Sequence, residues 1–133
     1  MSERYFTREE VEALIPTLRD LVARLQSAHA DGASAREWMQ TEHQRLTIAG
    51  GGMLDQDRWR ADSTRLEAGT KEAQAALGEI MALGGIVKDI GMGLVDFPGL
   101  REGRVVNLCW KQGETDIRWW HGMDEGFSAR KPL

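Results

Sequence analysis

The sequence predicts an α+β fold, in which a long N-terminal antiparallel helical hairpin, similar to a coiled coil, packs on a small C-terminal antiparallel β-meander. Two observations predict this class. Apolar residues recur in steps of three and four up to residue 83, as in packed helices, and they alternate with polar residues after residue 85, as in strands. The length of 133 residues suits one domain, with the hairpin over 1–83 and the meander and tail over 84–133.

The first helix has a clear start signal. Thr7 and Glu10 have the T-x-x-E spacing of a capping box, and Phe6 and Val11 match a hydrophobic staple around it. The apolar seam then passes through Pro16, where we expect a bend and not an end.

The same seam also passes the pair Asp31-Gly32. One helix of about forty residues and two helices with a joint near Asp31 both fit the apolar period. Because Asp and Gly are both poor helix formers, we favour the joint.

A second seam follows the triple glycine Gly50–Gly52, which predicts the turn of the hairpin. Asp62 and Gly69 occupy two seam positions, and we expect looser packing there. The glycines at 84 and 85 are typical of a helix end. The apolar seam residues are Trp59, Leu66, Ala73, Ala76, Ile80 and Leu83.

Four strands are predicted after this point. Pro98 cannot donate to a ladder and should close the second strand. Glu102-Gly103 and Gln112–Thr115 give turn signals, and residues 123–133 are expected to be irregular. Trp110 and Trp119 are expected to fill the space between sheet and helices. The strands are Ile86–Asp89, Leu94–Phe97, Val105–Lys111 and Ile117–His121.

Composition excludes several classes of protein. The net charge is −4, with 17 Lys and Arg against 21 Asp and Glu, so we expect no nucleic acid partner. A single cysteine, Cys109, cannot form an internal disulfide and predicts a reduced, buried thiol. The sequence has neither a signal peptide pattern nor a long apolar run, so we expect no membrane contact and a cytoplasmic location.

Several motifs resemble a bacterial family known only as domain of unknown function 2203. They are V-K-D at Val87–Asp89, G-L-V-D-F-P at Gly93–Pro98, L-C-W at Leu108–Trp110, G-E at Gly113-Glu114, W-H at Trp120-His121 and D-E-G-F at Asp124–Phe127, followed by Arg130. The capping box with its Tyr-Phe-Thr opening and Leu14–Pro16 also resemble that family, whereas the middle of the chain is generic. The resemblance implies no activity, because the family has none assigned.

His121, Asp124 and Glu125 are the candidate metal ligands, since an imidazole and two carboxylates suit a divalent ion that Asp96 or Asp89 would complete. We favour the simpler interpretation that His121 ends its strand and is hydrogen-bonded to Asp124, Asp96 or a backbone carbonyl. We predict no other cofactor.

An acid/base site is a second candidate, with Asp96, His121 and Glu125 as its catalytic residues. Asp96 is more simply a structural ion-pair partner. Cys109 near His121 has the residue types of a nucleophile and its base, but its apolar neighbours favour an inert thiol. Trp120, Arg118 and Phe127 are the candidate interaction residues, since an exposed tryptophan is typical of an interface.

Three functional hypotheses follow. The favoured one is a non-enzymatic interaction or structural protein that self-associates as a homodimer through its hairpin. The second is a small metal-dependent or acid/base enzyme that uses the His/Asp/Glu cluster. The weakest is a factor whose hairpin tip, Gly50–Asp57 with its carboxylates Asp55 and Asp57, acts on RNA polymerase; it rests on analogy of fold alone.

Overall fold

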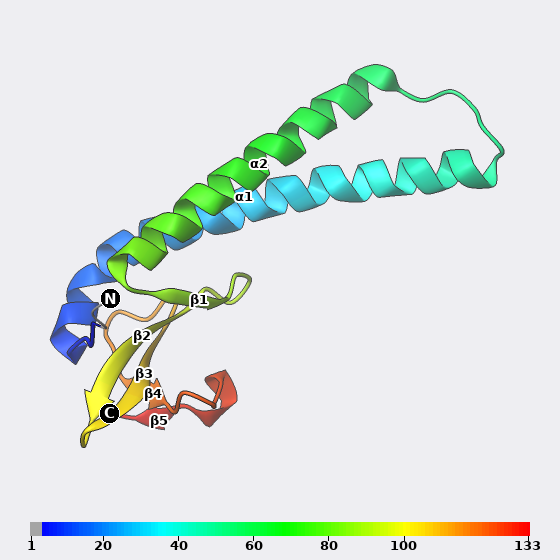
Figure 1. Cartoon of the computed structure of the whole chain (residues 1–133). Helices are drawn as coiled ribbons and strands as arrows, with labels where there is room; N and C mark the ends of the chain where they lie inside the picture. Colours follow the sequence, from blue (N-terminus) through cyan, green and yellow to red (C-terminus); the bar gives the residue numbers. More distant parts are fainter. Residues whose placement is uncertain (1–3) are drawn as a thin grey trace. The chain divides into compact units, whose positions relative to one another are not determined.

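The computed structural model describes residues 4–133 (Figure 1). The five strands form one antiparallel sheet in the order β1-β2-β3-β4-β5, so the predicted α+β class and meander are confirmed. The elements are α1 (Arg8–Ile48), α2 (Gln56–Leu83), β1 (Ile86–Asp89), β2 (Leu94–Arg101), β3 (Arg104–Lys111), β4 (Trp119–His121), the short 3-10 helix η1 (Phe127–Ala129) and β5 (Lys131–Pro132).

The chain divides into two compact units. The sheet unit holds Met1–Ala23 and Ala76–Leu133, and the hairpin unit holds Arg24–Ala75. Each unit therefore contains a part of both helices. The expectation of one domain over residues 1–133 stays a prediction. Within residues 4–133, no helix has both the length and the apolar character that crossing a membrane requires.

The start of α1 is the predicted capping box. The Thr7 N–H donates to Glu10 Oε1 at 2.9 Å, and the Glu10 N–H donates to Thr7 Oγ1 at 3.1 Å. Phe6 and Val11 are both buried, as the staple requires.

The favoured joint near Asp31 is wrong, because α1 is one helix from Arg8 to Ile48. Gly32 and Ala35 are buried, and a Cβ on Gly32 would lie 3.6 Å from Leu66 Cδ1. The small residues thus let the second helix pack against this turn. That packing outweighs the low helix propensity of the Asp31-Gly32 pair.

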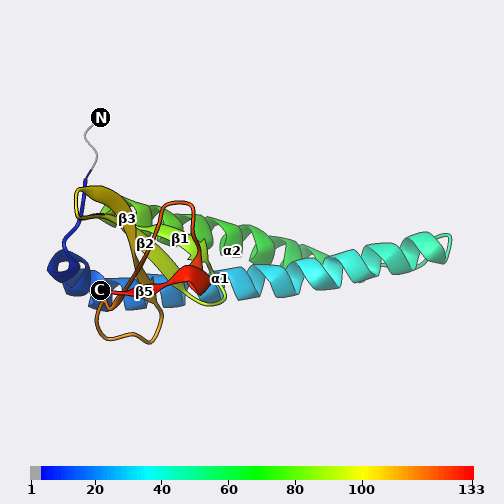
Figure 2. The ribbon, with the colours of Figure 1, turned by 90° about the horizontal axis from the view of Figure 1, so that it is seen from below.

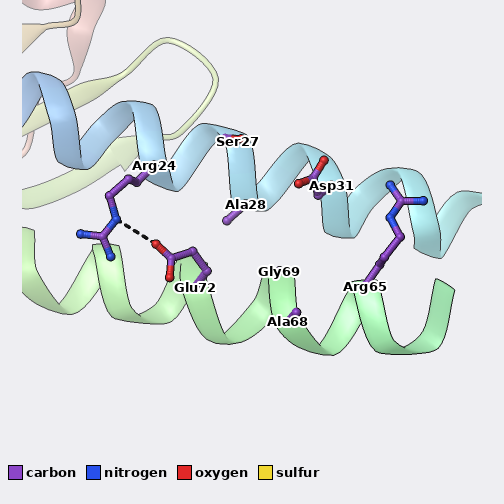
Figure 3. Close-up of a pocket in the computed structure, with 8 residues that line it drawn as sticks. All are labelled: Arg24, Ser27, Ala28, Asp31, Arg65, Ala68, Gly69 and Glu72. Carbon is purple, nitrogen blue, oxygen red and sulfur yellow. Dashed lines mark hydrogen bonds and ion pairs between the residues drawn. The ribbon is translucent and has the colours of Figure 1, made fainter. Parts of the chain in front are cut away.

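In the hairpin unit the two helices run antiparallel. Arg24 Nε donates to Glu72 Oε1 at 2.8 Å, and further along the pair the rings of Trp38 and Trp59 are 6.2 Å apart. Figure 3 shows Arg24 and Glu72 pointing toward one another across the pair.

Gly69 lies between those two contacts, and the predicted loose packing there is wrong. A Cβ on Gly69 would lie 2.9 Å from the Ala28 carbonyl oxygen and 3.2 Å from the Gly32 nitrogen. The glycine therefore permits close approach of the two backbones, which a larger side chain would prevent.

Asp62, on the same seam, has a buried carboxylate. Its Oδ1 lies 3.4 Å from Arg65 Nη1 and its Oδ2 lies 3.9 Å from Arg58 Nε. The seam thus accepts a charge at this position because two arginines lie next to it.

In the sheet unit, one face of the sheet packs on the helices. We call it the inner face; it carries Val95, Phe97, Leu108 and Trp110, all buried. The ring of Phe6 meets Phe97 edge-on at 5.2 Å, and a Cβ on Gly85 would lie 2.8 Å from Val95 Cγ1. Trp110 is fully buried, and its Nε1 donates to the Glu114 carbonyl at 2.9 Å.

The opposite, outer face carries the residues that alternate with these. Trp119 pairs with Cys109, whereas Trp110 pairs with Val95. Because residues directly opposite in antiparallel strands share a face, Trp110 and Trp119 lie on different faces. The predicted double wedge is therefore wrong for Trp119, which is half-buried on the outer face.

Pro98 does not close β2, which continues to Arg101. β1 pairs with Leu94–Asp96 and does not extend as far as Pro98. The backbone of Pro98 therefore faces an open edge, where its carbonyl accepts the Phe6 N–H at 2.7 Å. A proline at such an edge costs no ladder hydrogen bond.

The end of the chain is more regular than expected. β4 begins at Trp119, because the N–H of Ile117 donates to Glu12 Oε1 at 3.1 Å and not to a neighbouring strand. The tail is not irregular throughout, since it contains η1 and β5, and β5 pairs with β4.

Candidate functional site

Three titratable side chains from three adjacent strands meet on the outer face. Asp96 of β2 pairs with Cys109 of β3, and His121 of β4 pairs with Asn107, two residues before Cys109. Asp96, Cys109 and His121 each offer one ligand atom, and these atoms lie within 4.8 Å of one another. The three residues are only 1%, 1% and 2% exposed. We call them the Asp-Cys-His cluster.

The imidazole of His121 has a defined orientation. Its Nδ1 lies 2.9 Å from the Gly122 carbonyl oxygen, which can only accept, so Nδ1 carries a proton. Its Nε2 lies 3.0 Å from Asp96 Oδ2. With Nδ1 bonded to this carbonyl, Nε2 is the ring nitrogen that faces the cluster.

Asp96 is short of hydrogen-bond donors. Among residues 4–133, neither of its oxygens meets the geometry of a hydrogen bond, although Oδ2 lies 3.0 Å from His121 Nε2 and the Cys109 thiol also interacts with the carboxylate. A buried carboxylate oxygen without a partner is costly, and such a group requires an explanation, for example an ion.

Cys109 is not poised as a nucleophile. Burial, reinforced by the charge of Asp96, raises the pKa of its thiol to about 12, and the Arg130 guanidinium acts in the opposite direction. A protonated thiol with 1% exposure offers little to a substrate, so the inert thiol expected from the sequence suits this geometry better than nucleophilic catalysis.

The cluster does have the donor set of a transition-metal site. Thiolate, imidazole and carboxylate are ligands of Zn²⁺ and its neighbours, and bonds of about 2.0–2.3 Å in a tetrahedron separate ligand atoms by roughly 3.3–3.6 Å. The Nε2–Oδ2 distance of 3.0 Å would thus widen by a few tenths of an ångström around an ion.

The ligands predicted from the sequence are brought together only in part. His121 is in the cluster, whereas Asp124 and Glu125 are exposed and lie outside it. Glu125 Oε1 accepts the Gly122 N–H at 2.8 Å and Lys131 Nζ at 2.6 Å, and these contacts lower the pKa of its carboxyl. Asp89 is also used elsewhere, since its Oδ1 accepts the Met92 N–H at 2.8 Å.

The structure therefore joins Asp96 to His121, which was one of the pairings weighed from the sequence, and adds Cys109. Glu125, the third predicted acid/base residue, is not part of this cluster. The assignment of catalytic residues stays a prediction.

The predicted interaction residues differ in their exposure and in the groups that they contact. Arg118 is exposed, and its Nε donates to Asp116 Oδ2 at 3.0 Å. Trp120 is half-buried between the cations of Arg101 and Lys131, which lie 5.0 and 4.7 Å from its ring. Phe127 is 37% exposed.

At the hairpin tip, Asp55 has a structural role. Its Oδ1 accepts the Arg58 N–H at 3.0 Å, which caps the start of α2. Asp57 lies in the first turn of that helix. The hypothesis of a polymerase-directed tip stays a prediction.

Arg130 and Glu114 are site residues that the motif reasoning did not identify. Arg130 Nη2 donates to the Cys109 carbonyl at 3.1 Å and to Glu114 Oε1 at 2.6 Å. The available signal was their place in the family motifs, which contain every residue of the cluster as well: Asp96 in G-L-V-D-F-P, Cys109 in L-C-W and His121 in W-H.

Comparison with known proteins gives one match. No curated protein and no solved structure matches this chain. The sequence model of one family, described as "Uncharacterized conserved protein (DUF2203)", matches residues 4–133. The resemblance seen in the motifs is therefore confirmed, and the chain belongs to the uncharacterized conserved family DUF2203.

Proposed function

We propose that this protein binds one divalent transition-metal ion, of the Zn²⁺ type, through Asp96, Cys109 and His121. The observation that carries the proposal is the meeting of three different ligand atoms within 4.8 Å, on residues that are at most 2% exposed. A simple His–Asp ion pair would not need the Cys109 thiol beside it.

Charge balance supports this proposal. A divalent ion bound by the Asp96 carboxylate, the Cys109 thiolate and a neutral His121 forms a centre with no net charge. Burying such a neutral centre avoids the large cost of burying a net charge. The ion would also give the Asp96 oxygens the partner that they lack within the described part of the chain.

The ligand types favour certain metals. A thiolate and an imidazole are soft or borderline ligands, which select Zn²⁺ and Co²⁺ over Mg²⁺ and Ca²⁺, whose ligands are oxygens. The almost complete burial of all three residues suits a centre that is closed to substrate, whereas three protein ligands leave the fourth position of a tetrahedron to another group.

Cobalt binding tests the proposal directly. Metal-free protein is titrated with Co²⁺, and we expect one equivalent to give an intense near-ultraviolet band from thiolate-to-cobalt charge transfer and the visible bands of a tetrahedral ion, which Zn²⁺ then abolishes. Cys109→Ser should remove the charge-transfer band. Asp124→Asn and Glu125→Gln, which alter exposed carboxylates outside the cluster, should leave it unchanged.

Circular dichroism shows whether each variant folds, and the rise in melting temperature of the wild type with one equivalent of Zn²⁺ gives a second measure that needs no variant. Absence of both the bands and the rise would end the proposal. Binding that survives Cys109→Ser but is lost in Glu125→Gln would move the site to the exposed carboxylates expected from the sequence.

Self-association is a second, separate proposal, and a different observation supports it. In the hairpin unit, Ile48 is 87% and Met53 is 90% exposed on the two sides of the glycine turn. Met39, Trp59 and Leu66 contribute to a groove in the same unit. Sedimentation equilibrium of the wild type and of Met53→Asp tests it: a monomeric wild type at high concentration would contradict it.

A further inference from the structure

We propose that Arg130 is a positioning residue of the cluster: its guanidinium holds the C-terminal strap, residues Gly122–Leu133, over Cys109 and thereby controls access to the thiol and to the ion. The part that concerns the ion rests on the proposed metal binding. The part that concerns the thiol does not, because it applies to the metal-free protein.

Arg130 contacts the cluster and the end of β3 together. Its Nη2 donates to the Cys109 carbonyl at 3.1 Å and to Glu114 Oε1 at 2.6 Å. The same Glu114 oxygen accepts the Lys111 N–H at 2.6 Å, so one carboxylate ties the guanidinium to the strand that carries Cys109. The Arg130 side chain is only 12% exposed.

Aromatic rings hold the guanidinium in place. It lies 4.9 Å from the centre of the Phe127 ring and 5.5 Å from that of Trp119. Phe127 belongs to the strap and Trp119 to β4, which pairs with Cys109. Arg130 therefore joins the strap to the outer face by stacking as well as by hydrogen bonds.

The strap crosses the outer face. It starts at Gly122, whose carbonyl accepts His121 Nδ1 at 2.9 Å, and it ends with β5 paired to β4. Between these points, Met123 lies near Pro98 and Val105 at one end of β3, and Phe127 lies near Lys111 at the other. In Figure 2 the red tail crosses in front of the strands.

Little apolar burial holds the strap down. None of the residues Gly122–Leu133 is buried, although Asp96, Cys109 and His121 beneath it are. Segments with few buried contacts open at low cost in free energy. The contact of Arg130 with the Cys109 carbonyl thus restrains the strap at Cys109 itself.

The single cysteine of the chain makes the test specific, because any thiol labelling reports on Cys109 alone. Metal-free protein is labelled with a maleimide under native conditions. Cys109 is 1% exposed, so labelling requires opening of the strap. Arg130→Met keeps the apolar stem and should raise the rate roughly ten- to hundredfold, the effect of losing a charge-assisted hydrogen bond.

Two further variants sharpen the result. Glu114→Gln should raise the labelling rate in the same direction, and combining it with Arg130→Met should add little, because both remove one interaction. Arg118→Ala is the matched control: this exposed arginine is paired with Asp116, not with the cluster, and its loss should leave the rate unchanged. Labelling of Arg130→Met at the wild-type rate would overturn the proposal.

Release of the bound ion gives a second, independent measurement. Release of bound Co²⁺ to a chelator should accelerate in Arg130→Met by a factor similar to that of labelling. If the wild type binds no ion while labelling accelerates, metal binding fails and the strap proposal for the thiol stands. If the wild type binds Co²⁺ but neither rate changes, the strap proposal alone fails. Should Arg130→Met be unfolded by circular dichroism, Arg130→Lys, which keeps the charge but cannot reach both acceptors, replaces it.

Discussion

Proton release on metal binding is a quantitative consequence of the cluster's geometry. In the metal-free cluster the Cys109 thiol carries a proton near neutral pH, because its pKa is raised to about 12. The proton on His121 Nδ1 stays, because it is bonded to the Gly122 carbonyl and Nδ1 is not a ligand atom. Binding of one ion to the Cys109 thiolate therefore displaces the thiol proton.

The displaced proton makes the affinity depend on pH. One displaced proton changes the binding constant about tenfold, or roughly 1.4 kcal/mol, per pH unit. The sign follows from competition: affinity rises with pH as long as the metal-free cluster keeps the thiol proton. Cys109→Ser keeps its hydroxyl proton and should lose this part of the pH dependence.

Calorimetric titration with Zn²⁺ near pH 7, repeated in buffers of different ionisation enthalpy, measures the number of protons as the slope of observed enthalpy against buffer enthalpy. We expect the slope of the wild type to exceed that of Cys109→Ser by about one proton. Equal slopes for the two proteins would refute the protonated state assigned to the Cys109 thiol.

Three predictions concern stability. Trp110→Ala should lower the free energy of unfolding by about 3–5 kcal/mol in urea titrations, since a fully buried indole and its bond to the Glu114 carbonyl are both lost. Thr7→Ala should lower the free energy of unfolding by about 1 kcal/mol in the same assay. The capping bonds lower the pKa of Glu10 in the folded state. The contribution of this carboxylate to stability is therefore present above its unfolded-state pKa and is lost as the pH falls through its folded-state pKa. Gly69→Ala should reduce thermal stability, since its Cβ would lie 2.9 Å from a backbone oxygen. Gly78→Ala, where a Cβ would meet no atom within 4 Å, should increase stability by roughly 0.5–1 kcal/mol. Equal effects at the two glycines would contradict the close approach of the helices.

Local sequence patterns predicted the elements well. The capping box needs only residues three positions apart, and its two hydrogen bonds form as expected. The joint near Asp31 was wrong because helix propensity is a local quantity, whereas Gly32 and Ala35 are held helical by packing in the hairpin unit. The expected strand end at Pro98 was wrong for a similar reason. The effect of this proline on β2 depends on how far the neighbouring strand β1 extends along β2.

The turn chemistry accounts for the pairing of two of the three cluster residues. Glu102 and Gly103 both have positive φ, 53° and 78°, as a two-residue hairpin turn requires, and Arg101 pairs with Arg104 across it. Five positions back from Arg101 is Asp96, and five positions on from Arg104 is Cys109. A two-residue turn at Glu102-Gly103 therefore implies that Asp96 lies opposite Cys109. This register was not predicted, because the second strand was expected to end at Pro98.

His121 could not be placed in the same way. The chain between β3 and β4 is an irregular loop, residues 112–118, and not a tight turn. A four-residue hairpin loop over Gln112–Thr115 would pair Lys111 with Asp116, and would thus put His121 opposite Val106 on the inner face. The observed partner of His121 is Asn107, one residue away, and a shift by one residue moves every side chain of a strand to the other face.

The two faces of the sheet have different roles: the inner face stabilises the fold, and the outer face carries the cluster to which the strap controls access. The inner face carries large apolar side chains such as Trp110 and Phe97, whose burial drives folding, whereas the outer face carries the polar cluster under a strap without a buried residue. Opening of the strap therefore exposes Cys109 without uncovering the apolar core. The thiol can thus meet solvent, or an ion, at a much smaller cost than global unfolding, so that changes at Arg130 should alter the opening rate with little effect on the melting temperature.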